Sequence, residues 1–278
     1  MKKEVFRILA VIATIVFTFT SCEMDNEMNN EMDNEMNNDN IGNIKLLETI
    51  SDDMGGYGMY EYDKQSRITK YSYFIPNKYG ERTLVHTLTF TYMGDDLTKV
   101  ISENEYYQQG YYKFEKSNNK INIHTSSGKN DKNAISSSLE LDSDGLPVRY
   151  NENLSKDGNP SRIITYQFQN GNLVKTTVEG KSYNNEIVTS STLFQYDEKS
   201  SPLYHCKTPK WFLFWYLREM CSLNNVTEST SSSSHNISDV ASDGEDSTST
   251  YEYVYDNNGF PTKRIEDGTK VTEYKYNK

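Results

Sequence analysis

One pattern recurs along most of the chain and constrains its fold more than any other feature of the sequence. A strand of alternating aromatic residues leads into a turn of the Asp-x-x-Gly type, followed by an apolar and then a basic residue. The clear copies are YEYDKQSRITK at 60–70, TFTYMGDDLTK at 89–99, SLELDSDGLPVR at 138–149, TYQFQNGNLVK at 165–175 and YEYVYDNNGFPTKR at 251–264, with weaker copies at 112–123 and 193–203. Asp or Asn at the start of such a turn bonds the backbone two residues on, and Gly supplies positive φ. Each copy predicts a β-hairpin, with positive φ at Gly145 and Gly259.

The residues before each turn alternate strictly between apolar and polar. Leu88 and Phe90 share one face of their predicted strand, and Thr87, Thr89 and Thr91 share the other. One face is therefore buried and the other is wet, which is typical of antiparallel sheet. We expect an all-β fold, an antiparallel meander of about seven repeated hairpins, closed or nearly closed into a barrel because long open edges aggregate. The threonine face belongs in water, so we expect a soluble barrel with its aromatic face inward.

Residues 204–250 interrupt the series of hairpins before its last copy. The segment PKWFLFWYLREMCS at 209–222 contains seven consecutive apolar residues, too few to span a membrane. It predicts a short buried helix that plugs or caps the barrel. The alternative is that Trp211 and Trp215 form a surface on which a ligand stacks. Residues 227–250 are rich in Ser and Thr, and for this low-complexity segment we expect a flexible loop.

Two cysteines, Cys206 and Cys221, flank the predicted helix. In an exported protein, a pair of spare cysteines favours a disulfide. An anaerobic environment would favour two thiols instead, so both alternatives stay open.

The start of the chain predicts export and a membrane anchor. A basic leader precedes an apolar run at 8–19, which is typical of a signal peptide and too short for a membrane-spanning helix. Thr20-Ser21-Cys22 then resembles the lipobox of bacterial lipoproteins. This resemblance implies that Cys22 carries a lipid and becomes the first residue of the mature chain. The alternative is an ordinary cleaved signal peptide, followed by a cysteine at this position by chance.

These features divide the chain into three parts. Residues 1–21 are the expected lipoprotein signal peptide. Residues 22–44 hold the lipidated cysteine and four copies of Glu-Met-Asp/Asn-Asn, whose Asp and Asn residues disfavour helix, so we expect a disordered tether. Residues 45–278 form the hairpin-repeat barrel domain.

The charge of the chain excludes one class of partner. The chain has 29 Lys and Arg against 40 Asp and Glu, for a net charge of −11. Removing residues 1–21, with three basic residues and one acidic residue, lowers the net charge to −13. Nucleic acid binding needs a basic face, so we expect no nucleic acid partner.

The sequence contains no recognisable catalytic or metal-binding motif. The four histidines, at 86, 124, 205 and 235, lie far apart in the sequence. DSDG at 142–145 is similar to the start of a calcium loop but lacks the later bidentate Glu, and a hairpin turn already explains it. Neither a Gly-x-Ser-x-Gly elbow nor a phosphate loop occurs. We expect no catalytic residues, no metal, no cofactor and no enzymatic activity.

Two resemblances rest on these motifs. The hairpin copies are similar to the YD repeats of large bacterial wall-associated and toxin-shell proteins. With its lipobox, its hairpin series, SLNNVTE at 222–228 and the final YEYVYDNNGFPTK, the chain resembles a Bacteroidetes lipoprotein family of unknown function described as porin-like in fold. This second resemblance covers residues 45–278 and implies a porin-like barrel. The family carries no known activity or site residues.

From these observations we expect a lipoprotein of the outer membrane, held by its lipid and exposed at the cell surface. It would act as a non-enzymatic binding or interaction module, with a glycan or a host-surface polymer as its ligand. The alternative is a periplasm-facing structural or carrier lipoprotein that encloses an apolar ligand.

Overall fold

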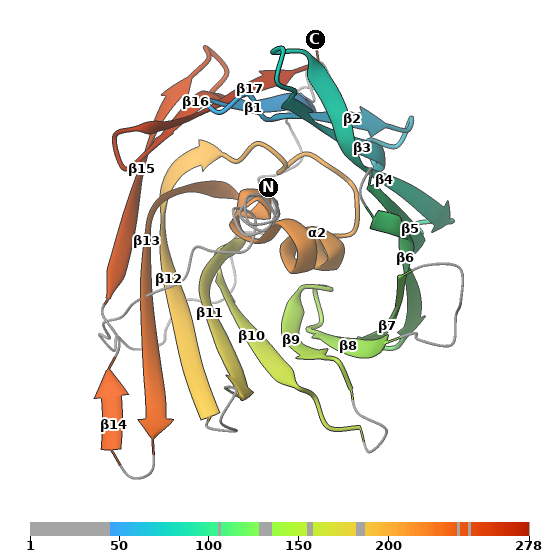
Figure 1. The fold of residues 1–278 in the computed structure, drawn as a ribbon, viewed down its shortest axis with the longest axis vertical. Coiled ribbons are helices and arrows are strands. Elements are labelled where there is room, and N and C mark those ends of the chain that lie inside the picture. The colour runs from blue at the N-terminus through green and yellow to red at the C-terminus, as the bar shows by residue number, and fades with distance from the viewer. Residues whose placement is uncertain are drawn as a thin grey trace, which may run out of the picture.

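The computed structural model describes residues 45–104, 107–127, 135–154, 158–181, 187–237, 240–243 and 246–277. The predicted signal peptide, Cys22 and nearly all of the tether lie outside these ranges. Within them, the strands form one antiparallel sheet that curls around a short helix (Figure 1).

The elements follow one another closely along the chain. The strands are β1 (Leu47–Asp52), β2 (Tyr57–Tyr62), β3 (Ile68–Pro76), β4 (Arg82–Met93), β5 (Asp96–Asn104), β6 (Tyr107–Ser117), β7 (Lys120–Ser127), β8 (Ile135–Leu141), β9 (Pro147–Glu152), β10 (Arg162–Gln169), β11 (Asn172–Lys181), β12 (Ile187–Ser200), β13 (Asn224–Ile237), β14 (Val240–Asp243), β15 (Ser247–Tyr255), β16 (Pro261–Glu266) and β17 (Lys270–Tyr276). Between β12 and β13 lie the helix α2 (Lys210–Leu217) and the 3₁₀ helix η3 (Arg218–Cys221).

The sheet closes on itself. Each strand of the wall pairs antiparallel with the next one along the chain, and β17 returns to β1, where Ile50 lies opposite Tyr274. β13 pairs with β15 through Glu228–Ser231, while β14 pairs with the outer end of β13. The closed ring therefore contains sixteen strands, with β14 as a short extension of one wall.

The predicted closed antiparallel barrel with one short helix is confirmed, but the prediction of about seven hairpins is too low. Of the sixteen strands of the ring, β1, β13 and β17 are the ones that the seven repeat copies do not include. β1 and β17 come from opposite ends of the barrel domain, and their pairing closes the ring. A pairing between such distant segments leaves no local sequence signal.

The predicted flexible loop at 227–250 is wrong for the residues that the structure describes. They lie in β13, β14 and the start of β15. Thr189 on β12 lies opposite Ser234 on β13, and Thr230 on β13 lies opposite Thr248 on β15. Backbone pairing with both neighbours holds β13 in the wall. Because Ser and Thr occupy both faces of this strand, no apolar alternation marks it in the sequence.

The predicted orientation of the two strand faces holds for Thr89 and Thr91, which are exposed, but not for Thr87, which is buried. Leu88 and Phe90 are buried in the core of the barrel, whereas Thr89 points outward and is exposed. The outer face also carries charged pairs, such as Lys70 with Glu61 at 3.3 Å across β3 and β2. This pair lies close to the turn at 63–67, at the end of β2 and the start of β3.

Among the described residues, no helix has the length and apolar character needed to cross a membrane.

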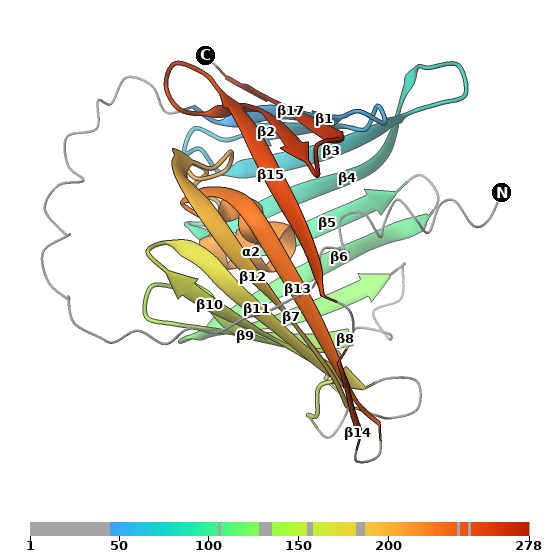
Figure 2. The same cartoon turned by 90° about the vertical axis from the view of Figure 1, so that its left-hand side faces the viewer.

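Because consecutive strands run antiparallel, their connections alternate between the two ends of the barrel. We call one end the helix end: it holds α2 and the turns at 63–67, 94–95, 118–119, 142–146, 170–171 and 256–260. Lys45 and Asn277, at the two limits of the barrel domain, lie at this end too, where the Asn277 amide donates to the Leu46 carbonyl. The other end, here the far end, is the end beyond which β14 projects (Figure 2).

The repeated turns at the helix end follow the predicted chemistry. The Asp256 carboxylate accepts hydrogen bonds from the amides of Asn258 and Phe260, at 2.9 and 3.0 Å. Gly259 has φ of +81° and Gly145 has φ of +77°, which confirms the positive φ predicted for both. The Asp stabilises the turn, and Gly takes the conformation that other residues adopt at a cost.

The strand-ending tyrosines of the repeat have a role that the sequence pattern alone does not show. Four of their hydroxyls donate to a backbone carbonyl at the start of the preceding strand: Tyr62 to Leu47, Tyr92 to Ile68, Tyr196 to Leu173 and Tyr276 to Pro261, at 2.8, 2.8, 2.5 and 2.9 Å. These tyrosines face the interior, so each ring fills the core while its hydroxyl ties two neighbouring strands together.

Replacing Gly259 with Ala should lower the free energy of unfolding by about 1–2 kcal/mol, because positive φ is strained for any residue with a Cβ. Gly180→Ala is a matched control. An added Cβ has its closest contact at 3.7 Å at both positions, but φ is positive at Gly259 alone of the two. Thermal or denaturant unfolding measures the difference. Equal stabilities for the two variants would contradict the positive-φ account of the turn.

Candidate binding site in the barrel interior

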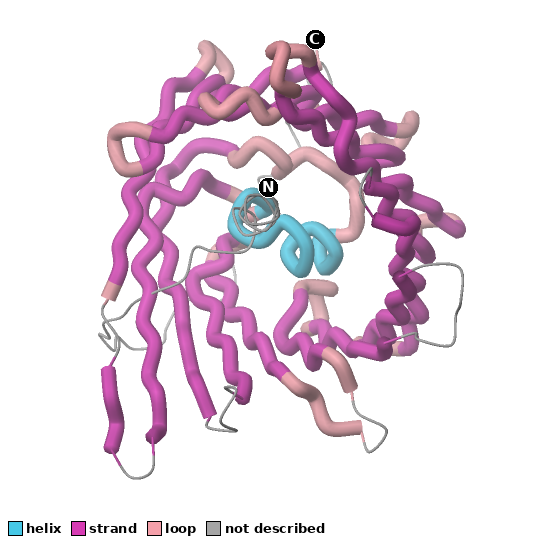
Figure 3. The backbone as a smooth tube through the Cα atoms, viewed as in Figure 1, coloured by secondary structure: helices cyan, strands magenta, loops and turns pink. Residues whose placement is uncertain are grey.

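The helix α2 lies inside the ring of strands (Figure 3). Its first turn follows Pro209, whose carbonyl accepts hydrogen bonds from the amides of Phe212 and Leu213. Phe212, Leu213 and Phe214 have at most 1% of their surface exposed. An all-round apolar helix is stable when protein covers most of its sides, and here the barrel wall provides that cover.

Aromatic rings hold α2 against several strands at once. Phe212 packs edge-on against Phe90 with ring centroids 5.4 Å apart, and Phe214 packs against Phe168 at 4.7 Å. Such edge-to-face pairs add to the stabilisation that burial of the rings already provides. The helix therefore plugs the interior, as the sequence predicted.

Trp211 and Trp215, considered above as a ligand-stacking surface, belong to this aromatic core. Trp211 is buried and packs against Phe114 at 5.1 Å. Trp215 is half-buried and packs against Tyr112 at 5.5 Å and Tyr150 at 5.7 Å. Both indoles therefore pack against the wall, and ligand stacking on Trp211 and Trp215 stays a prediction.

Replacing Phe212 with Ala should lower the free energy of unfolding by about 3–5 kcal/mol, the usual cost of truncating a buried Phe. Val254→Ala is the control, because Val254 is half exposed on the outer wall and its truncation should change stability by about 0.5 kcal/mol or less. Denaturant unfolding measures both values. A loss below about 1 kcal/mol for Phe212→Ala would mean that α2 does not support the wall.

Two hydrogen-bonded clamps fix the ends of the plug segment. Before α2, Thr208 Oγ1 accepts from the Ile68 amide at 2.8 Å and lies 3.0 Å from the Tyr92 hydroxyl. After η3, Ser222 Oγ accepts from the Leu173 amide at 3.2 Å and lies 3.1 Å from the Tyr196 hydroxyl. Tyr92 and Tyr196 are two of the strand-tying tyrosines, so the plug is fastened to the repeat itself.

Cys206 and Cys221 lie beside these clamps and are both buried, with 2% and 1% of their surface exposed. In the structure they are thiols and do not form the disulfide considered above. Burial raises the pKa of the Cys206 thiol, which keeps it in the protonated, unreactive form.

Beyond the plug, inward-facing positions become polar. On β12 and β13, Ser190 and Thr192 point the same way as the buried Phe194, and they lie opposite Ser233 and Ser231. On β9 and β10, Glu152 and Arg162 alternate in phase with buried residues and form an ion pair of 3.7 Å. The interior is therefore apolar around α2 and hydroxyl-rich or charged toward the far end.

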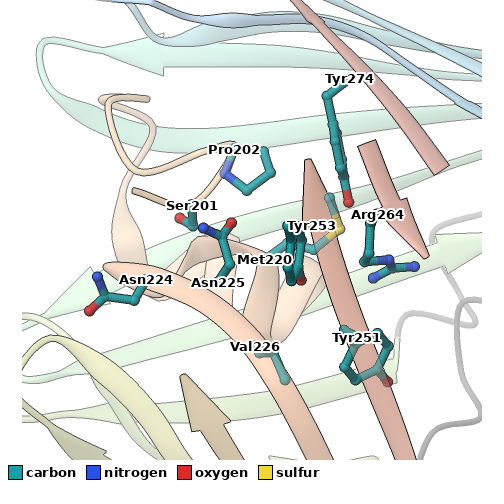
Figure 4. Close-up of a pocket in the computed structure, with 10 residues that line it drawn as sticks. All are labelled: Ser201, Pro202, Met220, Asn224, Asn225, Val226, Tyr251, Tyr253, Arg264 and Tyr274. Atoms are coloured by element: carbon teal, nitrogen blue, oxygen red, sulfur yellow. The ribbon is translucent and has the colours of Figure 1, made fainter. Parts of the chain in front are cut away.

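A pocket lies where the plug segment meets β15, β16 and β17. Its lining residues are Ser201, Pro202, Met220, Asn224, Asn225, Val226, Tyr251, Tyr253, Arg264 and Tyr274. In Figure 4, Asn225 and Arg264 stand on opposite sides of the Tyr253 ring. The pocket is partly open and has a volume of about 20 Å³, which is room for about one water-sized group.

Two buried polar atoms in this pocket have no hydrogen-bond partner among the described residues: Asn225 Oδ1 and Arg264 Nε. One is an acceptor and the other a donor. Leaving such a group buried and unpaired costs about 1–3 kcal/mol, and more when it is charged. Burial also raises the pKa of Tyr253, so its hydroxyl is neutral and able to donate. The pocket thus offers a neutral aromatic ring beside unused hydrogen-bonding capacity.

The sequence did not identify Asn225 or Arg264 as site residues. Asn225 lies in the SLNNVTE segment, and Arg264 ends the last repeat copy. The sequence signal for Arg264 was its position directly after Lys263. Successive side chains of a strand point to opposite faces, so one of the two must point inward. Which of them faces inward depends on the pairing of Tyr253 with Arg264, which only the structure gives.

Among the residues described, no group of three or more His, Cys, Asp or Glu side chains is placed to hold a metal ion. His86 faces the interior, where burial lowers its pKa, and its Nε2 lies 3.0 Å from the Ser102 hydroxyl. This neutral histidine has a hydrogen-bond partner in the wall.

No protein-family profile and no curated protein matches the chain. Among solved structures, the chain is similar to the crystal structure, at 2.80 Å resolution, of a porin-like protein from Bacteroides vulgatus. The two chains are 12% identical and align with a TM-score of 0.42, over 84% of this chain and 99% of the other.

Proposed function

We propose that this chain is a non-enzymatic glycan-binding lipoprotein, held at the outer-membrane surface by a lipid on Cys22. The observation that carries the proposal is the pocket beside Tyr253, where aromatic rings adjoin the unpaired Asn225 Oδ1 and Arg264 Nε. Binding sites for small molecules combine aromatic walls with a few fixed polar groups. A sugar supplies what this pocket lacks: an apolar ring face together with hydroxyl donors and acceptors.

The position of the anchor supports display of this interior. A tether that ends at residue 44 meets the barrel at Lys45, which lies at the helix end. α2 fills the interior near that end, whereas the polar part of the interior lies toward the far end. A barrel anchored at its helix end would turn its polar far end away from the membrane and toward ligands in the surroundings. The pocket, which is lined by Ser201, Pro202 and Met220 of the helix-end connection, lies nearer the anchored end.

The distribution of polarity supports a glycan over the apolar ligand of a carrier. The apolar part of the interior is already occupied by buried side chains of α2, such as Phe212 and Phe214. An apolar ligand there would have to displace these rings. The inward Ser and Thr positions of β12 and β13 instead offer hydroxyl groups that suit a polar ligand.

Replacing Cys22 with Ala should abolish labelling of the protein by a fatty-acid analogue in growing cells and shift it from the membrane fraction to the soluble fraction. Cys206→Ala is the control, because Cys206 is buried in the barrel domain and should not affect lipidation. If the Cys22→Ala protein is still labelled, the lipoprotein assignment is wrong.

Replacing Tyr253 with Ala should weaken binding of oligosaccharides by roughly tenfold or more, because it removes the ring between Asn225 and Arg264. Calorimetric titration of the mature protein in detergent with neutral and acidic trisaccharides would measure the affinities. Tyr57→Ala is the control, because Tyr57 lies on the outer face of β2, under the Arg82 guanidinium. Absence of binding to every oligosaccharide tested would overturn the glycan proposal.

A further inference from the structure

Arg264 occupies a position that the repeat fills differently elsewhere. In the five clear copies, the basic residue after the turn faces outward: Lys70, Lys99, Arg149, Lys175 and Lys263. The next residue faces inward, opposite an apolar or aromatic side chain of the same hairpin. Those inward residues are Tyr71, Val100, Tyr150, Thr176 and Arg264. Lys263 already provides the outward charge in the last copy, so the repeat does not require a second one at Arg264.

The charge of Arg264 is only partly compensated by its neighbours. Its Nη2 lies 3.5 Å from Glu266 Oε2, a long contact, while Lys270 Nζ lies 2.6 Å from the other oxygen of the same carboxylate. Arg264 and Lys270 thus share the Glu266 carboxylate, and the Asp267 carboxylate is a second negative group near Lys270. The guanidinium also lies over the Tyr251 ring, with Cζ 5.2 Å from the centroid. A partly buried guanidinium in these surroundings gains from a second anion.

The orientation of the Asn225 amide is fixed by its neighbours. Its Nδ2 donates to the carbonyls of Lys199 and Ser200, at 3.1 and 3.2 Å, and to the Asp197 carboxylate at 3.3 Å. All three partners are acceptors, so a flipped amide would place Oδ1 against three oxygens. Oδ1 is therefore an acceptor with no partner among the described residues, on a side chain that lines the pocket.

The size of the pocket decides which part of a ligand enters it. Room for about one water-sized group admits a substituent but not a whole sugar ring. Guanidinium groups pair best with carboxylates, to which Nε–H and Nη–H donate side by side. The sugar ring itself would lie along Tyr253, which stands between Asn225 and Arg264 in Figure 4.

We propose that the pocket beside Arg264 binds the carboxylate of an acidic sugar unit, with a hydroxyl of the same sugar donating to Asn225 Oδ1. This specificity rests on the proposed glycan-binding function and adds the chemical class of the glycan: chains that contain uronic acids or other carboxylated sugars.

The test compares the trisaccharide of galacturonic acid with the neutral trisaccharide of glucose, titrated into the mature protein in detergent. The acidic trisaccharide should bind roughly ten- to hundredfold more tightly, as expected for charge-assisted hydrogen bonds. Arg264→Gln should remove this difference, so that the acidic trisaccharide binds no more tightly than the neutral one. Arg162→Gln is the matched control, because Arg162 also faces inward with a carboxylate partner but lies on β10, outside the pocket.

A second variant keeps the test decisive if Arg264→Gln does not fold. Glu266→Gln removes the carboxylate that competes for Arg264, so it should strengthen binding of the acidic trisaccharide several-fold. Weaker or unchanged binding by this variant would overturn the proposal.

The remaining outcomes separate the two proposals. Equal affinity for both trisaccharides would overturn the carboxylate site and leave glycan binding standing, whereas no binding of either would overturn both. Equal losses in Arg264→Gln and Arg162→Gln would show a general charge effect and overturn the site. If acetate binds as tightly as the acidic trisaccharide, the ligand is a free carboxylate and the assignment to a sugar is wrong.

Discussion

The arrangement of the interior depends on the two clamps at the ends of the plug segment. The hydroxyls of Tyr92 and Tyr196 tie neighbouring strands together, as those of Tyr62 and Tyr276 do elsewhere in the ring. In the inserted segment, Thr208 also contacts the Tyr92 hydroxyl and Ser222 also contacts the Tyr196 hydroxyl. The insertion is therefore attached to the same tyrosine hydroxyls that tie neighbouring strands together. This attachment holds the apolar residues of α2 against the inward aromatic face of the wall.

This attachment also explains where the pocket lies. Ser222 ends the plug segment, and Asn225 is the second residue of β13, in the same pocket as Met220 of η3. Ring contacts hold α2 against β4, β6, β9 and β10. The pocket lies on the side of the plug segment that faces the tyrosines of β15 and β17.

The sequence predicted the features that repeat locally and missed those that depend on distant pairing. The hairpins, the positive φ of Gly259 and the buried helix follow from patterns of fewer than fifteen residues each. The strand β13 escaped notice because Ser and Thr lie on both of its faces, so its order comes from backbone pairing with β12 and β15 rather than from apolar alternation. The closure of β1 with β17 and the pocket both depend on pairing between distant segments. Asn225 and Arg264 line one pocket only after the wall has formed.

A repeated barrel offers a simple route to a binding site. Each hairpin places its inward residues in nearly the same backbone setting, and the turns and tyrosine bonds that hold the hairpin do not involve the position that Arg264 occupies. A charged side chain can therefore replace a core residue there without loss of the repeat's own contacts. The cost is the partial desolvation of the guanidinium, which Glu266 and the Tyr251 ring offset in part. Arg264 thus keeps contacts with Glu266 and with the Tyr251 ring of its own copy, and these contacts hold a charged side chain at an inward position of the repeat.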